Sequence, residues 1–372
     1  MKLVIFGLTV SSSWGNGHAT LWRGLIRSLV QLGHRIVFFE RDVPYYANER
    51  DLTEIPGGEL VLYEDWNGVR ARAKRELRDG DVAMITSFCP DGVAAAELIF
   101  DCGGPVAAFY DLDTPITLAR LSRGEDIPYI GPSGLADFDF TLSYTGGRAL
   151  QALRRDLGAR AVFPLYGHAD PEIHSPVAPA DHYRADLSYL GTYAQDRQDA
   201  LARLFVEPAR GRPKQRFAIG GAQYPQEFPW SDNIYFVRHL PPSEHPAFFS
   251  SSRMTLNVTR RDMAAMGWCP SGRLFEAAAC GTAILTDEWD GLANFYEPGE
   301  EILPVHTTED VLAALDLPDE TIARIARAAR ERTLDQHTSR HRAADLVAIC
   351  ENMASEKHPQ RFEQVESKPC GG

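Results

Sequence analysis

The chain has 372 residues, of which 44% are hydrophobic and 24% charged, and this is long enough for two domains with separate cores. Its net charge of −13 argues against a broad phosphate-backbone interface, so no nucleic-acid partner is expected. Six cysteines without paired spacing indicate reduced thiols rather than disulfides or a zinc site. No segment approaches the roughly 18 apolar residues of a membrane span, so we expect a cytoplasmic protein. The first ten residues also fit a short signal peptide, but a glycine turn and a helix pattern follow them instead of a cleavage site.

The first half of the chain alternates short apolar runs with helical patterns. This rhythm predicts β-α-β units and a parallel sheet with helices on both faces. Leu21, Leu25 and Leu29 share one face of a predicted helix over residues 19–33, which Gly33 ends in a left-handed turn. The predicted strands cover residues 2–8, 34–40, 81–88, 105–113, 138–144 and 161–166.

A second α/β rhythm follows a segment rich in proline and histidine between Pro164 and Asp186, which is typical of a connection between domains. The predicted strands here cover residues 186–193, 215–221, 234–240, 254–259, 282–287 and 300–305, and the predicted helices cover 198–205, 270–281, 309–316, 320–333 and 339–353. We therefore expect an α/β protein with two Rossmann-like, doubly wound domains that face each other across a cleft at the carboxyl ends of their strands. The expected parts are an N-terminal domain over 1–172, a linker over 173–186, a C-terminal domain with the terminal helices over 187–353, and a flexible tail over 354–372.

The sequence SSSWGNGHAT, residues 11–20, lies between the first predicted strand and the first predicted helix. Gly15 and Gly17 allow a tight turn there, and the start of the helix directs backbone N–H groups toward a ligand. His18 would stand at the helix N-terminus, where the imidazolium form is disfavoured and a neutral ring accepts a proton from a hydroxyl. A histidine that only caps the helix fits the same pattern.

The segment from Pro270 to Ile302 carries a stronger signal. It predicts a helix with Glu276 about one turn from its start, where a carboxylate can accept hydrogen bonds from the vicinal hydroxyls of a ribose. Arg273, one turn earlier, is placed to meet a phosphate. A solvated Arg–Glu pair on a helix surface is the alternative, but the apolar residues around Glu276 argue against it.

These residues resemble a known family. RLFEAAACGTAILTD, followed by GL and EPGEEI, is similar to the carboxyl-terminal domain of glycosyltransferases with the two-Rossmann GT-B architecture, specifically the CgeB-like, spore-maturation group. YLGTYAQDR, MTLNVTRRDM, GNGHA and PLYGHADPEIHSP resemble further segments of this group or of related enzymes. The likeness extends to about residue 350 and is more specific in the second domain than in the first.

The resemblance implies transfer of a hexose-type sugar from a nucleoside diphosphate sugar, with UDP the favoured nucleotide, to an unidentified acceptor. By this analogy Glu276 holds the ribose, Arg197 and Arg273 neutralise the diphosphate, and His239 borders the base. The remaining residues implied for the donor are Gly15, Gly17, Gly191, Thr192 and Asn257. Arg260 and Arg261 are further phosphate candidates, or else solvated loop cations.

One departure from the family concerns the stereochemistry of transfer. Many retaining enzymes of this architecture carry a second glutamate eight residues before the ribose-binding one, and Trp268 stands at that position here. Whether the sugar is transferred with retention or inversion is therefore left open.

Asp111 and Asp113 follow an apolar run and are expected near the cleft. They would line the acceptor site or orient the catalytic His18, while capping of the loop before Pro115 is the alternative. Two carboxylates without a histidine or a third acid are weak evidence for a metal site, so we expect neither a metal nor a cofactor besides the nucleotide-sugar substrate.

Glu40, Arg41 and Asp42 follow the second predicted strand, where they would contact the acceptor or cap the strand end. Two other functions fit the same architecture. A nucleotide-sugar 2-epimerase would consume the donor without any acceptor, and a non-catalytic sugar- or nucleotide-binding assembly protein would bind it without turnover.

Overall fold

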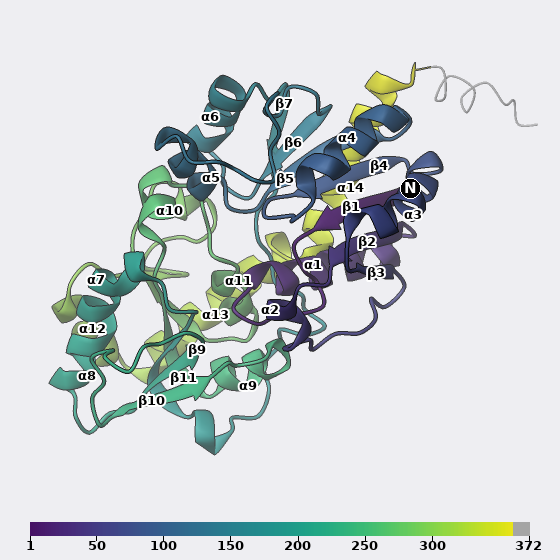
Figure 1. The fold of residues 1–372 in the computed structure, drawn as a ribbon. Coiled ribbons are helices and arrows are strands. Elements are labelled where there is room, and N and C mark those ends of the chain that lie inside the picture. Colours follow the sequence, from purple (N-terminus) through teal and green to yellow (C-terminus); the bar gives the residue numbers. More distant parts are fainter. Residues whose placement is uncertain (360–372) are drawn as a thin grey trace, which may run out of the picture. The chain divides into compact units, whose positions relative to one another are not determined.

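The computed structural model describes residues 1–359, and its backbone contacts divide the chain into two compact units. The first unit consists of Met1–Ser11, Leu25–Leu165 and the residues from Arg340 onward, and the second consists of Ser12–Gly24 and Tyr166–Ser339. Figure 1 shows the sheet of the first unit in purple to blue and that of the second in green, each with helices packed against it.

The first unit is built on a sheet of seven parallel strands in the order β3-β2-β1-β4-β5-β6-β7. Its strands are β1 (Lys2–Gly7), β2 (Arg35–Arg41), β3 (Glu59–Tyr63), β4 (Val82–Thr86), β5 (Val106–Asp111), β6 (Phe140–Ser143) and β7 (Ala161–Pro164). Its helices are α1 (Gly17–Gln31), α2 (Pro44–Ala47), α3 (Trp66–Arg78), α4 (Gly92–Cys102), α5 (Thr114–Ser122), α6 (Arg148–Leu157) and α14 (Ser339–Lys357), of which α1 begins among residues grouped with the second unit. All six predicted strands are present, and β1, a fully buried run, is the strand at which the order reverses.

The second unit is built on six parallel strands in the order β10-β9-β8-β11-β12-β13. Its strands are β8 (Ala185–Leu190), β9 (Phe217–Gly221), β10 (Ile234–Arg238), β11 (Ser252–Asn257), β12 (Ala283–Thr286) and β13 (Leu303–Pro304). Its helices are α7 (Gln198–Leu201), α8 (Glu207–Gly211), α9 (His245–Ser250), α10 (Arg261–Met266), α11 (Gly272–Ala279), α12 (Thr308–Leu315) and α13 (Asp319–Gln336). Single turns are the 3-10 segments η1 (Asp181–Tyr183), η2 (Gln195–Arg197), η4 (Pro242–Glu244) and η5 (Leu292–Asn294), while η3 (Ala202–Val206) is π-helical.

The strand orders confirm the predicted fold class of two Rossmann-like, doubly wound domains. In each sheet the order reverses beside the first strand of the unit, β1 or β8. Ligands of such sheets bind outside the carboxyl ends of the strands at this reversal. The loops that follow β8 and β11 are therefore the first place to look for a site in the second unit.

The terminal helix α14 belongs to the first unit, although we expected it in the C-terminal domain. Ala343, Leu346 and Cys350 form its buried face. At its end, the Lys357 Nζ donates to the Pro105 carbonyl at 2.9 Å and to Asp139 Oδ2 at 2.7 Å. Helical periodicity predicts that a face is buried, but it does not say against which core.

Three further boundaries differ from the expected parts. Residues 12–24 group with the second unit instead of the first, and the expected linker over 173–186 lies inside the second unit. Of the expected flexible tail, residues 354–357 are helical and 360–372 lie outside the described residues.

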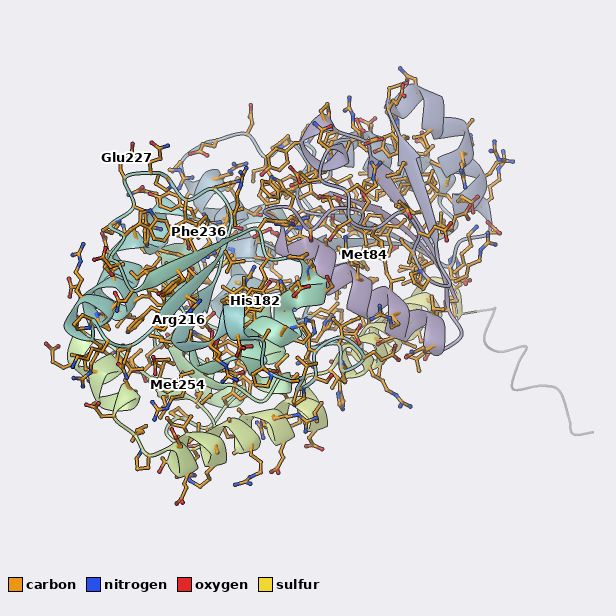
Figure 2. The ribbon with its side chains drawn as sticks, turned by 90° about the horizontal axis from the view of Figure 1, so that it is seen from below. Met84, His182, Arg216, Glu227, Phe236 and Met254 are labelled. Atoms are coloured by element: carbon orange, nitrogen blue, oxygen red, sulfur yellow. The ribbon has the colours of Figure 1, made fainter. Side chains whose placement is uncertain are left out.

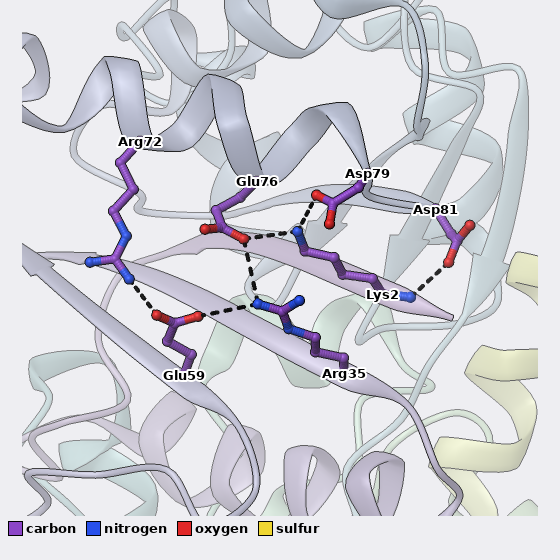
Figure 3. Close-up of polar contacts among 7 residues, drawn as sticks. All are labelled: Lys2, Arg35, Glu59, Arg72, Glu76, Asp79 and Asp81. Atoms are coloured by element: carbon purple, nitrogen blue, oxygen red, sulfur yellow. Dashed lines mark hydrogen bonds and ion pairs between the residues drawn. The ribbon is translucent and has the colours of Figure 1, made fainter.

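Charged residues at the start of the first sheet form a network of ion pairs (Figure 3). The Lys2 Nζ lies 2.8 Å from Glu76 Oε2 and also pairs with Asp79. Arg35 lies 3.7 Å from Glu59 and 3.9 Å from Glu76. These ion pairs join β1, β2, β3 and α3 at the amino edge of the sheet, so the charged residues of this cluster have a structural role. Among the helices of residues 1–359, none is long and apolar enough to cross a membrane.

Candidate functional site

Backbone strain gathers in the loops after the strands. The non-glycine residues with positive φ in the described chain are Phe88, Gln223, His239 and Trp268. Phe88, Gln223 and His239 follow β4, β9 and β10 within two residues, and Trp268 precedes α11. Such conformations cost about 1–3 kcal/mol each and cluster at functional sites. This supports the carboxyl edge of the second sheet as the candidate site.

In the loop after β8, the guanidinium of Arg197 contacts the hydroxyl of Tyr189. The Arg197 Nη1 donates to the Tyr189 hydroxyl at 3.2 Å and to the Thr192 carbonyl at 3.4 Å. Burial lowers the pKa of Arg197, but the neighbouring Tyr189 outweighs it, so the net pKa shift is upward and the side chain is cationic. Its Nε has no hydrogen-bond partner within residues 1–359. A buried donor without a protein acceptor is available to a ligand or a water molecule.

Gly191 has no room for a side chain in this loop. A Cβ there would stand 2.6 Å from the Tyr189 hydroxyl and 3.1 Å from Arg197 Nη1. The Gly191 carbonyl also accepts a hydrogen bond from the Tyr224 hydroxyl at 3.1 Å. Gly191 therefore lies directly beside Arg197, and its role at the donor stays a prediction.

Arg273 presents a second guanidinium without a protein acceptor. It is the second residue of α11, and its backbone N–H donates to the N-cap side chain of Ser271 at 3.4 Å. Within residues 1–359 its half-buried guanidinium forms no hydrogen bond or ion pair, and its Nε is buried. Burial raises the pKa of Tyr224, while Arg197 and Arg273 both act to lower it. Both arginines thus lie near Tyr224.

The other two predicted phosphate ligands are already paired. The Arg260 Nε donates to Asp196 Oδ2 at 2.9 Å. The Arg261 Nη2 donates to Asp199 Oδ2 at 3.0 Å, in a pair that is mostly exposed to solvent. The structure therefore distinguishes Arg197 and Arg273, which lack a carboxylate partner, from Arg260 and Arg261, which have one.

Glu276 lies on the buried face of α11 and is only 7% exposed. Its Oε2 accepts a hydrogen bond from His245 Nδ1 at 3.1 Å. Burial raises the pKa of Glu276. The His245 hydrogen bond and the charges of His174 and Arg273 lower it by more, so the net pKa is about 2. The carboxylate is therefore ionised at neutral pH, and His245 and His174 are partners that sequence reasoning missed. Both histidines lie far from α11 in the chain, and no local pattern connects them to it.

The ends of β11 and β12 are joined by polar side chains. Asn257 Nδ2 donates to Thr286 Oγ1 at 3.1 Å and to Thr259 Oγ1 at 3.4 Å. Asp287 Oδ1 accepts from the Thr259 backbone N–H at 2.8 Å. Burial raises the pKa of Asp287, and the hydrogen bonds from Thr259 oppose that shift. The amide hydrogens of Asn257 are thus directed to protein acceptors, while Asp287 is a half-buried acid at this edge that the sequence analysis did not single out.

The glycine turn groups with the second unit. Gly15 has a φ of +60°, and a Cβ on Gly17 would lie 3.9 Å from Arg273 Nη1. The helix cap is supplied by Asn16, whose Oδ1 accepts from the His18 backbone N–H at 2.9 Å, so capping does not require the His18 side chain. The His239 ring lies 4.6 Å from the Trp14 ring between centroids.

Glu40 anchors the start of this turn within the first unit. Its buried carboxylate accepts from the Val10 and Ser11 backbone N–H groups at 2.7 and 3.0 Å, and from Thr9 Oγ1 at 2.7 Å. Arg41 instead pairs with Asp91 at 3.2 Å. Asp42 pairs with Arg50 at 2.7 Å. For Glu40 these contacts favour the strand-end alternative, because the carboxylate fixes the turn that leads to His18.

Asp111 and Asp113 lie at the end of β5 in the first unit. Asp111 is fully buried, and its Oδ1 accepts from the Asp113 backbone N–H at 3.0 Å. Asp113 is half-buried at the start of α5. Their roles toward an acceptor or toward His18 stay predictions.

A cavity of about 400 Å³ opens at the opposite, amino edge of the second sheet. It is lined by Arg216 and Arg253 among others. Arg216 stacks 3.8 Å from the Tyr235 ring and donates to the His182 carbonyl at 3.1 Å; Figure 2 labels both Arg216 and His182. Arg253 is bound to Asp319 and to the carbonyls of Leu315 and Leu317. Arg253 therefore has a carboxylate partner, whereas Arg216 has none, and its Nε lacks a hydrogen-bond partner among residues 1–359, as at Arg197.

Comparison with known proteins gives a matching family model over residues 197–348 and a similar fold for nearly the whole chain. Residues 197–348 match the model of a family described as "Glycosyl transferase-like". No curated protein matches the sequence.

Solved structures of similar fold cover nearly the whole chain. Sucrose-phosphate synthase from Thermosynechococcus elongatus has a TM-score of 0.68 at 12% identity and covers 95% of this chain and 99% of its own. An alpha-glucosyltransferase in complex with UDP has a TM-score of 0.64 at 11% identity and covers 94% and 100%. HepE of Anabaena in complex with UDP-glucose has a TM-score of 0.64 at 11% identity and covers 94% and 99%. The chain therefore has the GT-B fold of glycosyltransferases, and its sequence is glycosyltransferase-like over residues 197–348.

Proposed function

We propose that this protein is a glycosyltransferase of the CgeB-like type that transfers a sugar from a nucleoside diphosphate sugar, with UDP as the nucleotide, to an acceptor. The observation that carries the proposal is the pair of half-buried guanidiniums, Arg197 and Arg273, that lack a carboxylate partner at the carboxyl edge of the second sheet. The family match over residues 197–348 supports it. Two structures of similar fold are described with UDP or UDP-glucose bound.

The donor would be held by residues of the second unit. Arg197 and Arg273 would contact the diphosphate, for which the planar guanidinium is well suited. The N–H groups at the start of α11 would add to the stabilisation of the nucleoside diphosphate leaving group, so that the transfer step does not require a metal ion. Gly191 and Thr192 would bring backbone close to the phosphates, and Glu276 would accept from the ribose hydroxyls.

In this proposal His18 is the general base for the acceptor hydroxyl. It is the second residue of α1, at a helix N-terminus. Asp111 and Asp113 are the proposed acceptor-side residues. His239, whose backbone N–H donates to the Gly221 carbonyl at 2.7 Å, would border the base.

The test is calorimetric titration of the protein with UDP, GDP and dTDP, repeated with Glu276→Ala. We expect micromolar binding of UDP. The substitution should weaken it about ten- to a hundredfold, because charge-assisted hydrogen bonds contribute roughly 1.5–3 kcal/mol. Absence of binding by all three nucleotides would contradict the proposal.

A second assay separates transfer from the two alternative functions. Incubation with a UDP-sugar alone should leave the donor almost intact, and release of UDP should require an acceptor. Conversion of the sugar without any acceptor would indicate an epimerase. Tight binding without turnover in the presence of candidate acceptors would indicate a non-catalytic binding protein.

A further inference from the structure

The contacts of Glu276 leave its two carboxylate oxygens in different situations. Oε2 accepts from His245 Nδ1 at 3.1 Å. Oε1 accepts no hydrogen bond from any residue in the described part of the chain, and the side chain keeps 9% of its surface exposed. A carboxylate is an acceptor only, so the hydrogen in the contact with His245 belongs to Nδ1. Oε2 is therefore hydrogen-bonded to the protein, and Oε1 is available as an acceptor.

The His245 ring is itself held in place. His245 is the first residue of α9, it is only 5% exposed, and Phe249 one turn later packs edge-on against it at 6.2 Å between ring centroids. Because the His245 ring is confined in this way, rotation of the Glu276 carboxylate would break their hydrogen bond. The contact thus fixes the orientation of Glu276 as well as its charge.

A second imidazole, His174, lies beside this pair, and the three side chains could also be considered as metal ligands. Their ligand atoms lie within 4.8 Å of one another. However, His174 Nδ1 accepts from the Asp170 backbone N–H at 3.2 Å, so the hydrogen of the neutral ring is on Nε2. With one nitrogen occupied by an N–H donor and the other protonated, the neutral ring offers no lone pair to a metal. The donor set fits two imidazoles around an anion better than a metal centre.

We propose that His245 is a positioning residue that holds Glu276 Oε2, so that Oε1 is aimed at the ribose 2′-hydroxyl of the donor nucleotide. This inference rests on the proposed function, because it assumes that the second unit binds a ribonucleotide. It goes beyond that function by assigning the discrimination between ribose and 2′-deoxyribose to a contact between α9 and α11. His174 adds a second imidazole, whose ligand atom lies within 4.8 Å of those of His245 and Glu276.

The experiment compares UDP and 2′-deoxy-UDP by calorimetry. The wild-type protein should prefer UDP by about tenfold, since one charge-assisted hydrogen bond is lost with the 2′-hydroxyl. His245→Leu removes the donor and should reduce this preference to less than about threefold. His245→Asn, whose amide nitrogen can occupy the position of Nδ1, should retain most of it, whereas His245→Gln, whose amide reaches the position of Nε2, should lose it.

The outcomes separate the inference from the proposed function. A wild-type protein that binds neither nucleotide defeats the function. A wild-type protein that binds UDP with preference, together with a His245→Gln protein that keeps the full preference, overturns only the role of His245. A merely structural role would lower the melting temperature of the variants without changing the ratio of the two dissociation constants. If His245→Leu does not fold, the Asn and Gln variants carry the comparison.

A metal-dependent alternative is tested in the same titration. Dialysis of the wild-type protein against EDTA should leave the ratio of the two dissociation constants unchanged. A ratio that falls on chelation and returns on addition of Zn²⁺ would replace the proposed hydrogen-bonded group by a metal site.

Discussion

At the scale of single residues, the ionisation of Glu276 links the candidate site to acid stability. The folded-state pKa of Glu276 is about 2, below its ordinary value of 4.5. A lowered carboxyl pKa stabilises the fold at pH values above the unfolded pKa, and this contribution is lost as the pH falls from about 4.5 toward 2. Glu276→Gln should therefore show a shallower loss of unfolding free energy over this range than the wild-type protein. Urea unfolding at a series of pH values measures the difference, and parallel curves would contradict the assignment.

His18 carries the prediction for the chemical step. His18→Ala should lower turnover by about 10²- to 10⁴-fold, which is the usual contribution of a general base, while UDP affinity stays nearly unchanged. His306→Ala is the matched control, because His306 is an exposed histidine paired with Glu288 at 3.2 Å. A kinetically silent His18→Ala would leave His18 without a catalytic role.

Residue types at the site were accessible from the sequence, but their partners were not. The pattern around RLFEAAACG predicted both the helix and the cleft-side positions of Arg273 and Glu276. It could not distinguish Arg273 from Arg260 and Arg261, because the carboxylates that pair with the latter two come from η2 and α7, about sixty residues earlier. His245 was missed for the same reason, since its contact with Glu276 spans 31 residues.

At the scale of elements, the loop after β8 depends on the absence of a side chain at Gly191. Gly191→Ala would place a Cβ 2.6 Å from the Tyr189 hydroxyl and so displace the side chain that binds Arg197. Overpacking of this kind costs about 1–3 kcal/mol, and we expect both lower stability and weaker UDP binding. In Gly211→Ala, the control, the nearest atom would be 3.7 Å away in Leu312. Denaturant unfolding and calorimetry check both variants, and equal behaviour of the two would refute the packing argument.

The elements that the sequence predicted best are those with buried, continuous apolar runs. All twelve predicted strands are present, whereas the edge strand β3 was missed, although the less buried edge strand β10 was predicted. The predicted helix over residues 198–205 begins as α7 and continues as the π-helical η3. Apolar periodicity alone does not resolve that change of helix type.

At the scale of the whole molecule, each unit includes a segment that is distant in the sequence: the second unit includes residues 12–24, and the first includes the residues from Arg340 onward. The first unit takes up α14, whose face of Ala343, Leu346 and Cys350 is buried. A chain that ends at residue 339 should therefore unfold at a clearly lower temperature than a chain that ends at residue 359, because the first unit loses this cover. Calorimetric unfolding compares the two truncations, and equal melting temperatures would contradict the role of α14.

The central claim is that the carboxyl edge of the second sheet binds a nucleoside diphosphate through arginines that have no carboxylate partner. The most direct measurement is calorimetric titration of UDP into the wild-type protein, Arg273→Ala and Arg261→Ala. We predict that Arg273→Ala weakens UDP binding about ten- to a hundredfold, because a charged hydrogen bond to phosphate is lost. Arg261→Ala should change it by less than about threefold, since an exposed ion pair contributes little. Equal affinities of Arg273→Ala and the wild-type protein for UDP would contradict the claim.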